Sequence, residues 1–373
     1  MTPPARHYLD HASTSPARPE VVAEIARVLQ RPGGDPSRSH AEGLEARVIV
    51  ETAREQVAVL LGTRPRSVVF TSGGTEAIIT ACWGAAERGA HQVLSAVEHS
   101  AVRLGAEAQG AVTIVGADRR GRVDPEALLA AIRPDTSLVH LQWGNHEVGT
   151  RQGVAEVTAA CRERGVLVHI DAAQAAGHEP VAFDELGADL LSVSAHKLGG
   201  PSGVGALLVR RGLRLRPLLV GGDQERARRA GMEPVAALAG FGAAAEALTG
   251  GRLEKEATLH RSLTDRLLAG AGALDGVQPY GDPADRLPHL VCFGIEGIEP
   301  QAVLLSLDRA GISAHSGSAC SSEALEPSPV LEAMGVDAHR SLRLSVGWSS
   351  GEDDVDAVLD GLPPILEQLR ALR

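Results

Sequence analysis

Short apolar segments alternate with helical segments over residues 67–209, and this alternation constrains the fold more than any other feature of the sequence. Helical stretches at 74–88, 100–109, 124–132 and 153–164 separate most of the apolar segments. Short apolar strands that alternate with helices form a mostly parallel sheet covered on both faces. We therefore predict an α/β fold with a mostly parallel seven-stranded sheet, made of residues 67–70, 92–97, 111–115, 137–142, 166–170, 189–194 and 203–209.

The rest of the chain predicts a second, smaller domain. Pro16 and Pro19 open a helix that runs to about Gln30, and Ser39 is the expected N-cap of a helix that reaches Leu61. An Ala-rich helical stretch at 234–273 joins the two parts. We then expect strands 289–295, 312–314 and 341–346 and helices 299–310 and 351–372. We predict a large α/β domain at 15–250, and a small α+β domain formed by 1–14, an extended arm, together with 251–373.

Composition excludes several classes of protein. The net charge of −11, from 36 basic and 47 acidic side chains, argues against a nucleic-acid-binding surface. The four cysteines share no CxxC spacing, so neither a zinc site nor a disulfide framework is indicated. No apolar run approaches the ~20 residues of a membrane span, and the N-terminus lacks the apolar core of a signal peptide. We therefore expect a cytoplasmic protein.

Lys197 is the first candidate for chemistry. The chain has two lysines, and the other, Lys255, lies in a charged segment that reads as a solvated helix face. Lys197 instead sits between an apolar strand and a Gly-rich turn, where a lowered pKa would let its amine form a Schiff base. A single lysine after a strand is more often a surface residue, so its assignment depends on the other strand ends.

Three other strand ends carry polar groups, and in a parallel sheet the ligand site lies beyond these ends. Gly73 and Gly74 precede a helix and can expose free N–H groups to a phosphate, although a plain turn is also compatible. His99 can stack on a planar ring or cap a helix. Asp171 ends a buried strand and needs a cationic partner, unless it is a structural cap. With Lys197, these residues predict a pyridoxal-phosphate pocket.

The motifs at these positions resemble those of fold-type I, class V aminotransferase-like enzymes, and within them cysteine desulfurases of the NifS/IscS type. The resemblance covers nearly the whole chain. It is most specific in Ser-Ala-His-Lys at 194–197, Asp-Ala-Ala-Gln at 171–174, Ser-Gly-Ser-Ala-Cys-Ser-Ser at 316–322 and Ser-Leu-Arg-Leu-Ser at 341–345. It implies a reaction that converts L-cysteine into L-alanine and transfers sulfur to an acceptor protein.

The resemblance also assigns roles to single residues. It implies that Lys197 bonds the cofactor and removes the substrate α-proton, that Asp171 pairs with the pyridinium and that Gln174 bonds the ring hydroxyl. The remaining assignments follow in the same way: His99 stacks on the ring and carries a proton, Gly74, Thr75, Ser194 and His196 hold the phosphate, His146 faces the ring hydroxyl, and Asn145 and Arg343 bind the substrate.

Cys320 is the expected nucleophile. It lies in a stretch of small and polar residues at 315–328, a composition that predicts a mobile surface loop. Cys82, Cys161 and Cys292 lie in helical or strand patterns and read as buried core residues. The loop resembles that of the long-loop group of desulfurases, in which the cysteine takes the sulfur as a persulfide and delivers it to a partner.

Two residues depart from the family pattern. His146 replaces an asparagine; an imidazole titrates near neutrality, and we expect it to alter the pH response of the bound cofactor. Met232 replaces a threonine that reaches the phosphate of a neighbouring subunit, so we expect a homodimer with a more loosely held cofactor. A selenocysteine lyase, a small-amino-acid aminotransferase and a non-catalytic sulfur-transfer scaffold remain alternatives. Iron–sulfur clusters, tRNA thiolation, DNA sulfur modification and a specialised thio-metabolite are all compatible destinations of the sulfur.

Overall fold

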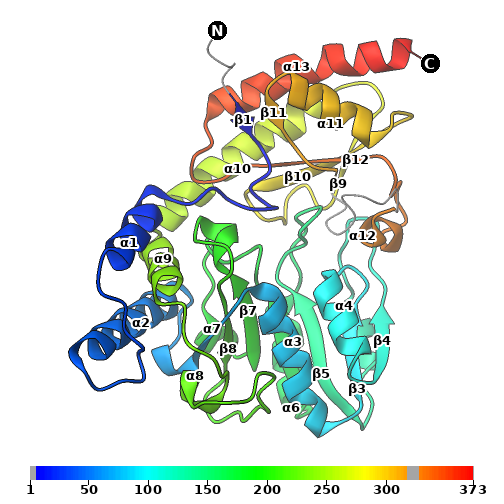
Figure 1. Cartoon of the computed structure of the whole chain (residues 1–373). Coiled ribbons are helices and arrows are strands. Elements are labelled where there is room, and N and C mark those ends of the chain that lie inside the picture. The colour runs from blue at the N-terminus through cyan, green and yellow to red at the C-terminus, as the bar shows by residue number, and fades with distance from the viewer. Residues whose placement is uncertain (1–5, 317–326, 373) are drawn as a thin grey trace.

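A computed structural model describes residues 6–316 and 327–372. Its centre is a seven-stranded sheet with the order β2-β8-β7-β6-β5-β3-β4 (Figure 1). Within the described chain, β8 alone runs antiparallel to its neighbours β2 and β7, so the predicted mostly parallel sheet is confirmed. The strands are β2 (Val68–Thr71), β3 (His91–Ser95), β4 (Ala111–Val115), β5 (Thr136–Gln142), β6 (Leu167–Asp171), β7 (Leu190–Ser194) and β8 (Gly205–Val209).

Helices cover both faces of this sheet because successive strand residues point to opposite sides. In β2, Val68 and Phe70 enter a core shared with α2 (Ala41–Leu60) and α9 (Val235–Glu246). Val69, between them, enters a separate core with α3 (Gly74–Ala85). The other helices of this part are α1 (Pro19–Leu29), α4 (Ser100–Glu107), α5 (Pro125–Ala130), α6 (Val154–Glu163), α7 (Phe183–Leu186) and α8 (Gln224–Ala227).

Two helix predictions need correction. The N-cap of α2 is His40 instead of Ser39, because the His40 imidazole Nδ1 accepts the backbone N–H of Gly43 at 3.3 Å. The helical stretch predicted at 234–273 is two helices, α9 and α10 (Arg252–Ala271). Gly250 and Gly251 separate them with φ of 64° and 81°, a left-handed conformation that ends a helix and favours glycine.

A second, antiparallel sheet has the order β12-β10-β9 and lies under α10, α11 and α13 at the top of Figure 1. Its core includes Leu9, Phe293, Leu342 and Val355, whereas Leu290 and Val330 of the same segment pack into the core of the large sheet. This separate core supports the predicted small domain, whose boundaries stay a prediction. Its elements are β1 (His7–Tyr8), β9 (Val277–Tyr280), β10 (Leu290–Ile295), α11 (Pro300–Arg309), β11 (Ile312–Ser313), α12 (Pro329–Ala333), β12 (Ser341–Ser345) and α13 (Glu352–Ala371).

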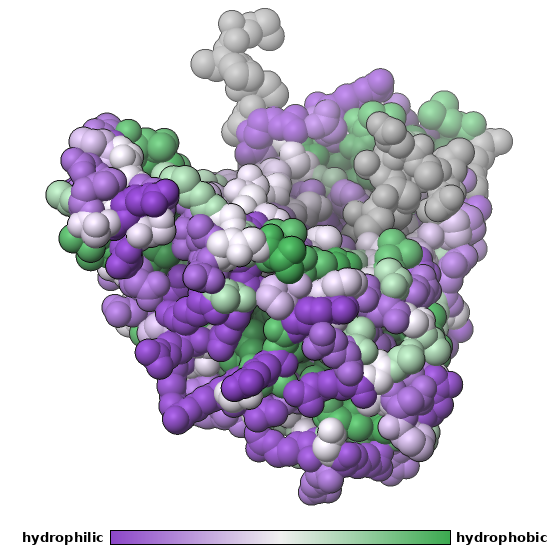
Figure 2. All heavy atoms as spheres, turned by 60° about the horizontal axis from the view of Figure 1, so that its bottom comes forward, coloured by the Kyte–Doolittle hydropathy of each residue, from purple (hydrophilic) through white to green (hydrophobic). Residues whose placement is uncertain are grey.

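The surface below the large sheet is mostly hydrophilic, as Figure 2 shows for the face at the bottom of Figure 1. Large apolar side chains at the corner formed by α1 and α2 are exposed, among them Leu29, Leu44 and Val48. No helix of residues 6–316 and 327–372 has the length and apolar character needed to cross a membrane.

Candidate active site

A cavity of about 270 Å³ lies at the carboxyl ends of the parallel strands. It gathers side chains that are far apart in the sequence, because β3, β5, β6 and β7 end at the same edge of the sheet. Ten of the predicted site residues line it: Gly74, Thr75, His99, His146, Asp171, Gln174, Ser194, His196, Lys197 and Arg343.

Of the predicted site residues that the structure describes, Asn145 does not line this cavity. Asn145 is fully buried, and its side chain holds a backbone turn: Nδ2 donates to Val97 O at 3.1 Å, while Oδ1 accepts the N–H groups of Glu147 and Val148 at 2.8 and 2.9 Å. Its expected contact with substrate stays a prediction. Cys320 lies outside the described residues, as does most of the loop predicted at 315–328.

Lys197 is held by backbone carbonyl groups of the N-terminal arm. The 3₁₀ turn Ala195–Leu198 follows β7 and directs its Nζ to Ala12 O at 2.5 Å and to Ser13 O at 2.8 Å. Burial, and then the positive charge of Arg343, lower the pKa of Lys197 to about 8. A substantial share of the amine is therefore neutral near pH 8, as a Schiff-base lysine requires.

Asp171 ends β6 as a buried carboxyl, and burial raises its pKa. Its Oδ1 accepts the Ala173 N–H at 3.0 Å and lies 3.3 Å from Ser192 Oγ. Within the described residues, no Lys, Arg or His side chain forms an ion pair with it. Because a buried carboxylate is costly without a cation, the site fits a ligand with a basic ring nitrogen beside Asp171.

The N-terminus of α3 offers a place for an acidic group. Gly73 precedes this twelve-residue helix with φ of 152°, and a Cβ added there would meet nothing within 4 Å. The N–H groups of the first helical turn have no intrahelical acceptors and lie at the positive end of the helix dipole. Thr75, Ser194 and His196 line the same cavity. Burial lowers the pKa of His196 to about 4, so it contributes a neutral imidazole.

His99 and His146 meet in the cavity, with ring centroids 5.3 Å apart and an interplanar angle of 65°. His99 also caps α4, because its Nδ1 accepts the Ala101 N–H at 3.1 Å; a neutral His99 therefore carries its proton on Nε2. Burial lowers the pKa of His99 and places that of His146 well below its usual value. The expected titration of His146 near neutrality does not fit its buried position.

Arg343 connects β12 to the arm and to the loop after β5. Its Nη1 donates to His146 O at 2.9 Å, and its Nη2 donates to Asp10 Oδ1 at 3.0 Å and to Ser13 Oγ at 2.6 Å. Its Nε is buried and has no hydrogen-bond partner among the described residues. This unused donor fits the carboxylate of a small substrate.

The sequence did not assign any site role to the N-terminal arm. Asp10 pairs with Arg343, and Ala12 and Ser13 line the cavity beside Lys197. The polar residues Asp10, His11 and Ser13 were the available signal, but they follow no strand of the large sheet. Other lining residues that the sequence did not single out are Ile78, Gln142, Gly144 and Ala173.

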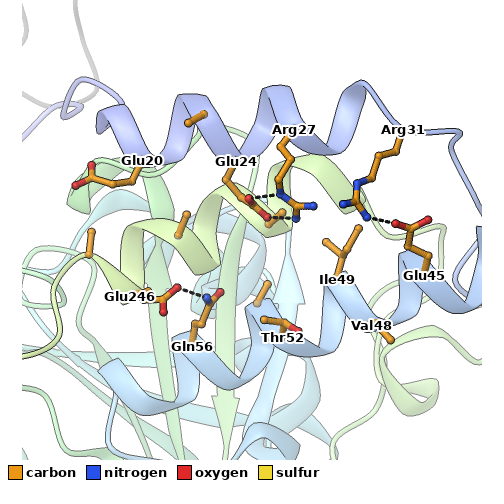
Figure 3. Close-up of a pocket in the computed structure, with 15 residues that line it drawn as sticks. Glu20, Glu24, Arg27, Arg31, Glu45, Val48, Ile49, Thr52, Gln56 and Glu246 are labelled. Carbon is orange, nitrogen blue, oxygen red and sulfur yellow. Dashed lines mark hydrogen bonds and ion pairs between the residues drawn. The ribbon is translucent and has the colours of Figure 1, made fainter.

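A second cavity, of about 620 Å³, lies between α1, α2 and α9 (Figure 3). Its charged side chains already have partners: Arg27 pairs with Glu24 and Arg31 with Glu45, while Glu20 pairs with Arg252 and Glu246 accepts the Gln56 amide. None of the predicted site residues lines it. The chemistry of the described chain therefore centres on the cavity at Lys197.

Comparison with known proteins extends over almost the whole chain. The family model described as Aminotransferase class-V matches residues 7–358. The cysteine desulfurase IscS of Dictyoglomus turgidum is 40% identical over 381 residues, with 98% of this chain and 95% of that protein covered. A solved NifS-like protein has a TM-score of 0.89 and 32% identity, covering 98% and 100% of the two chains. The structure of SspA in complex with cysteine has a TM-score of 0.80 and 27% identity, covering 91% and 98%.

Proposed function

We propose that this chain, which belongs to the class-V aminotransferase family, is a pyridoxal-phosphate-dependent cysteine desulfurase that converts L-cysteine into L-alanine and transfers the sulfur to an acceptor protein. The observation that carries the proposal is that Lys197 and Asp171 line the same cavity. The pKa of Lys197 is lowered to about 8, and the carboxyl of Asp171 is buried. The names of the 40% identical relatives, which are cysteine desulfurases, support the same reaction.

The residues of the cavity fit the parts of the proposed cofactor. Lys197 would bond its aldehyde carbon, Asp171 would pair with its ring nitrogen, and Gln174 and His146 would face its ring hydroxyl. Its phosphate would lie at the start of α3, against Gly74, Thr75, Ser194 and His196, and its ring would lie against His99. When bound, the cofactor withdraws electrons from the substrate α-carbon.

The protein side chains supply positioning and proton transfer. Arg343 holds the substrate carboxylate, which places the α-carbon beside Lys197. A neutral Lys197 Nζ accepts the α-proton, and the carbonyl groups of Ala12 and Ser13 hold this nitrogen in place before and after the transfer. His99, with its proton on Nε2, can donate a proton within the same cavity.

Cys320 takes the sulfur in this proposal. Its thiolate attacks the substrate sulfur, an S–S bond forms, the C–S bond breaks, and the bonding electron pair stays with the carbon, which becomes the methyl carbon of alanine after protonation. A later thiol of the acceptor protein attacks the outer sulfur and restores the Cys320 thiolate. The assignment of Cys320 rests on its sequence context.

We also propose that the active unit is a homodimer. A groove of about 770 Å³ at the corner of α1 and α2 is lined in part by Leu29, Ile49, Met232 and Val235. Leu29 is 70% exposed and Met232 is 61% exposed, a combination that favours an apolar partner such as a second copy of this chain. Sedimentation equilibrium tests this, because a single species with the mass of one chain would contradict it.

The test of the reaction is alanine released from L-cysteine by the purified, cofactor-loaded protein. We expect Lys197→Ala to lower this rate by at least about 10³-fold, since it removes both the cofactor bond and the base. Lys255→Ala is the matched control, because Lys255 is the other lysine and is exposed on α10. Cys320→Ala should also abolish alanine formation. Release of alanine from selenocysteine but not from cysteine would instead indicate a selenocysteine lyase.

A further inference from the structure

A continuous chain of hydrogen bonds runs through the sheet behind Asp171. His140 Nε2 lies 2.8 Å from Gln92 Oε1, His140 Nδ1 lies 3.0 Å from His169 Nδ1, and His169 Nε2 lies 3.1 Å from Ser192 Oγ. Ser192 Oγ lies 3.3 Å from Asp171 Oδ1. Gln92 is 2% exposed, and His140, His169 and Ser192 are fully buried.

The register of the strands creates this chain. His140 of β5 lies opposite His169 of β6, and Asp171 of β6 lies opposite Ser192 of β7. His169 and Asp171 are two residues apart in one strand, so their side chains share a face of the sheet. The series of hydrogen bonds therefore starts at Gln92 in β3 and passes through β5 and β6 to Ser192 in β7. It ends at the carboxyl group of Asp171 in β6, which faces the cavity.

Gln92 determines the direction in which the protons of this chain point. Its Nε2 donates to Cys82 O at 3.1 Å, so its Oε1 faces His140 and can only accept. His140 must then carry its proton on Nε2 and accept at Nδ1. His169 in turn must donate from Nδ1, which leaves a lone pair on Nε2 facing Ser192.

The hydroxyl of Ser192 then has one proton and two acceptors, His169 Nε2 and Asp171 Oδ1. If Asp171 is protonated, it donates to Ser192, Ser192 donates to His169, and every group in the chain is satisfied. If Asp171 is ionised, a bond from Ser192 to its carboxylate leaves His169 Nε2 without a donor. The fixed direction thus withholds the Ser192 proton from the carboxylate, which becomes more basic toward a ligand.

We propose that Gln92, His140 and His169 are positioning residues that turn the Ser192 hydroxyl away from Asp171 and so strengthen the hold of this carboxylate on the ring nitrogen of the cofactor. This inference rests on the proposed function, because it takes the ligand of Asp171 to be a protonated pyridine ring. The predicted proton positions on His140 and His169 follow from the protein alone.

Other titratable groups lie close to these hydrogen-bonded residues, and their protonation also contributes to a pH titration of the site. Cys82 Sγ of α3 lies 3.9 Å from His140 Nε2, and burial raises the pKa of this thiol to about 12. Glu98, after β3, is buried close to Asp171, and burial and then Asp171 raise its pKa to about 8. His99 and Lys197 face Asp171 from the cavity. Burial keeps both His140 and His169 neutral by lowering their pKa.

The experiment is ¹⁵N NMR of histidine side chains in the holoenzyme labelled at histidine, which distinguishes the two neutral tautomers. We expect neutral His140 protonated on Nε2 and neutral His169 protonated on Nδ1 at pH 7. His169 protonated on Nε2, or a charged state of either ring, would overturn the proposal. Because this measurement needs only the wild-type protein, the proposal stays testable even if a variant does not fold.

Gln92→Met sharpens the test because it removes the group that sets the direction. We expect His169 to change to the Nε2-protonated tautomer, so that Ser192 donates to Asp171. Gln152→Met is the matched control: Gln152 is a buried glutamine outside the cavity whose amide donates to Gly121 O at 2.7 Å and accepts the Val123 N–H at 3.0 Å, and both tautomers should persist in this variant. Unchanged tautomers in Gln92→Met would contradict the role of Gln92.

The consequence for the cofactor is measured by its visible absorbance as a function of pH. In Gln92→Met, a less basic Asp171 holds the ring proton less firmly, and the ring withdraws electrons less strongly from the nitrogen of Lys197. We expect the midpoint of the titration to rise by about 0.5–1 pH unit, the size of one neutral hydrogen bond. A midpoint that is unchanged or lower would overturn the proposal. A protein with the expected tautomers that binds no pyridoxal phosphate would contradict the proposed function instead.

Discussion

Two buried groups of histidines flank the active site, and they are built differently. Behind Asp171, His140 and His169 meet edge to face at 5.1 Å and 71°, and each of their four ring nitrogens has a hydrogen-bond partner. Behind Gln174 and Lys197, His178 and His289 stack at 3.6 Å and 9°. The Nδ1 atoms of both stacked rings have no hydrogen-bond partner among the described residues.

The His140 and His169 group therefore specifies proton positions, whereas the stacked His178 and His289 group mainly contributes packing. A fully satisfied buried network fixes every donor and acceptor, whereas each unpaired buried nitrogen costs stability. In the stacked group, His289 Nε2 bonds Gln174 Oε1 and His178 Nε2 bonds Lys197 O, both at 3.1 Å. These bonds orient the rings toward the site, but they do not continue beyond them.

The largest effect is expected for His169→Leu, which breaks the complete network. The variant leaves His140 Nδ1 without its donor and removes one partner of Ser192, so we expect a loss of about 2–4 kcal/mol in the free energy of unfolding. Urea denaturation at pH 7 measures this change. A loss below about 1 kcal/mol would show that the two histidine groups do not differ in the way described.

Coupling between His140 and His169 comes next in size. Because each single substitution already breaks their shared hydrogen bond, His140→Leu combined with His169→Leu should cost less than the sum of the two single changes, by about 1–3 kcal/mol. A double-mutant cycle from urea denaturation gives this difference. Additive free energies would mean that the two rings do not act as one network.

The cost of His169→Leu should also depend on pH. Burial lowers the pKa of His169 to about 3, below the value near 6.5 of an unfolded histidine. Below pH 6.5 the unfolded state therefore binds a proton that the folded state does not, and the wild type loses stability that the variant keeps. We expect the difference between them to shrink by about 1.4 kcal/mol per pH unit from about pH 6 downward. A constant difference from pH 7 to 4.5 would mean that His169 binds a proton in the folded protein as readily as in the unfolded chain, which would contradict its lowered pKa.

The smallest effect is expected for His260→Leu in the stacked group. His260 is 1% exposed, its ring lies 6.0 Å from that of His178, and neither of its nitrogens has a hydrogen-bond partner among the described residues. Replacing an unpaired buried polar ring with an apolar side chain should change the free energy of unfolding by less than about 1 kcal/mol, or increase it. A loss as large as that of His169→Leu would reverse the comparison.

The sequence predicts the strands of the large sheet and the main site residues because both are local signals. Apolar runs mark the strands; Asp171 ends β6, and Lys197 lies in the short turn after β7. Contacts set by register or by distant segments could not be predicted. His140 meets His169 only because β5 and β6 pair in one register, and Asp10 meets Arg343 across 333 positions of the chain.

A helix cap is also hard to assign from the sequence where two adjacent residues can both act as the N-cap. Ser39 and His40 both precede α2, and because the helix begins at Ala41, His40 occupies the N-cap position and makes the cap. His146 was expected to titrate near neutrality, but burial places its pKa well below the usual value. The sequence carries no information about this depth of burial.

The most direct test of the central claim is mass spectrometry of the holoenzyme after one turnover with L-cysteine, without reductant. We expect one additional sulfur atom on the peptide that contains Cys320, and none on the peptides that contain the buried Cys82, Cys161 and Cys292. The same sulfur should be absent in Lys197→Ala and present in Lys255→Ala. Alanine formed in full yield with Cys320 unmodified, or sulfur found on another cysteine, would contradict the account.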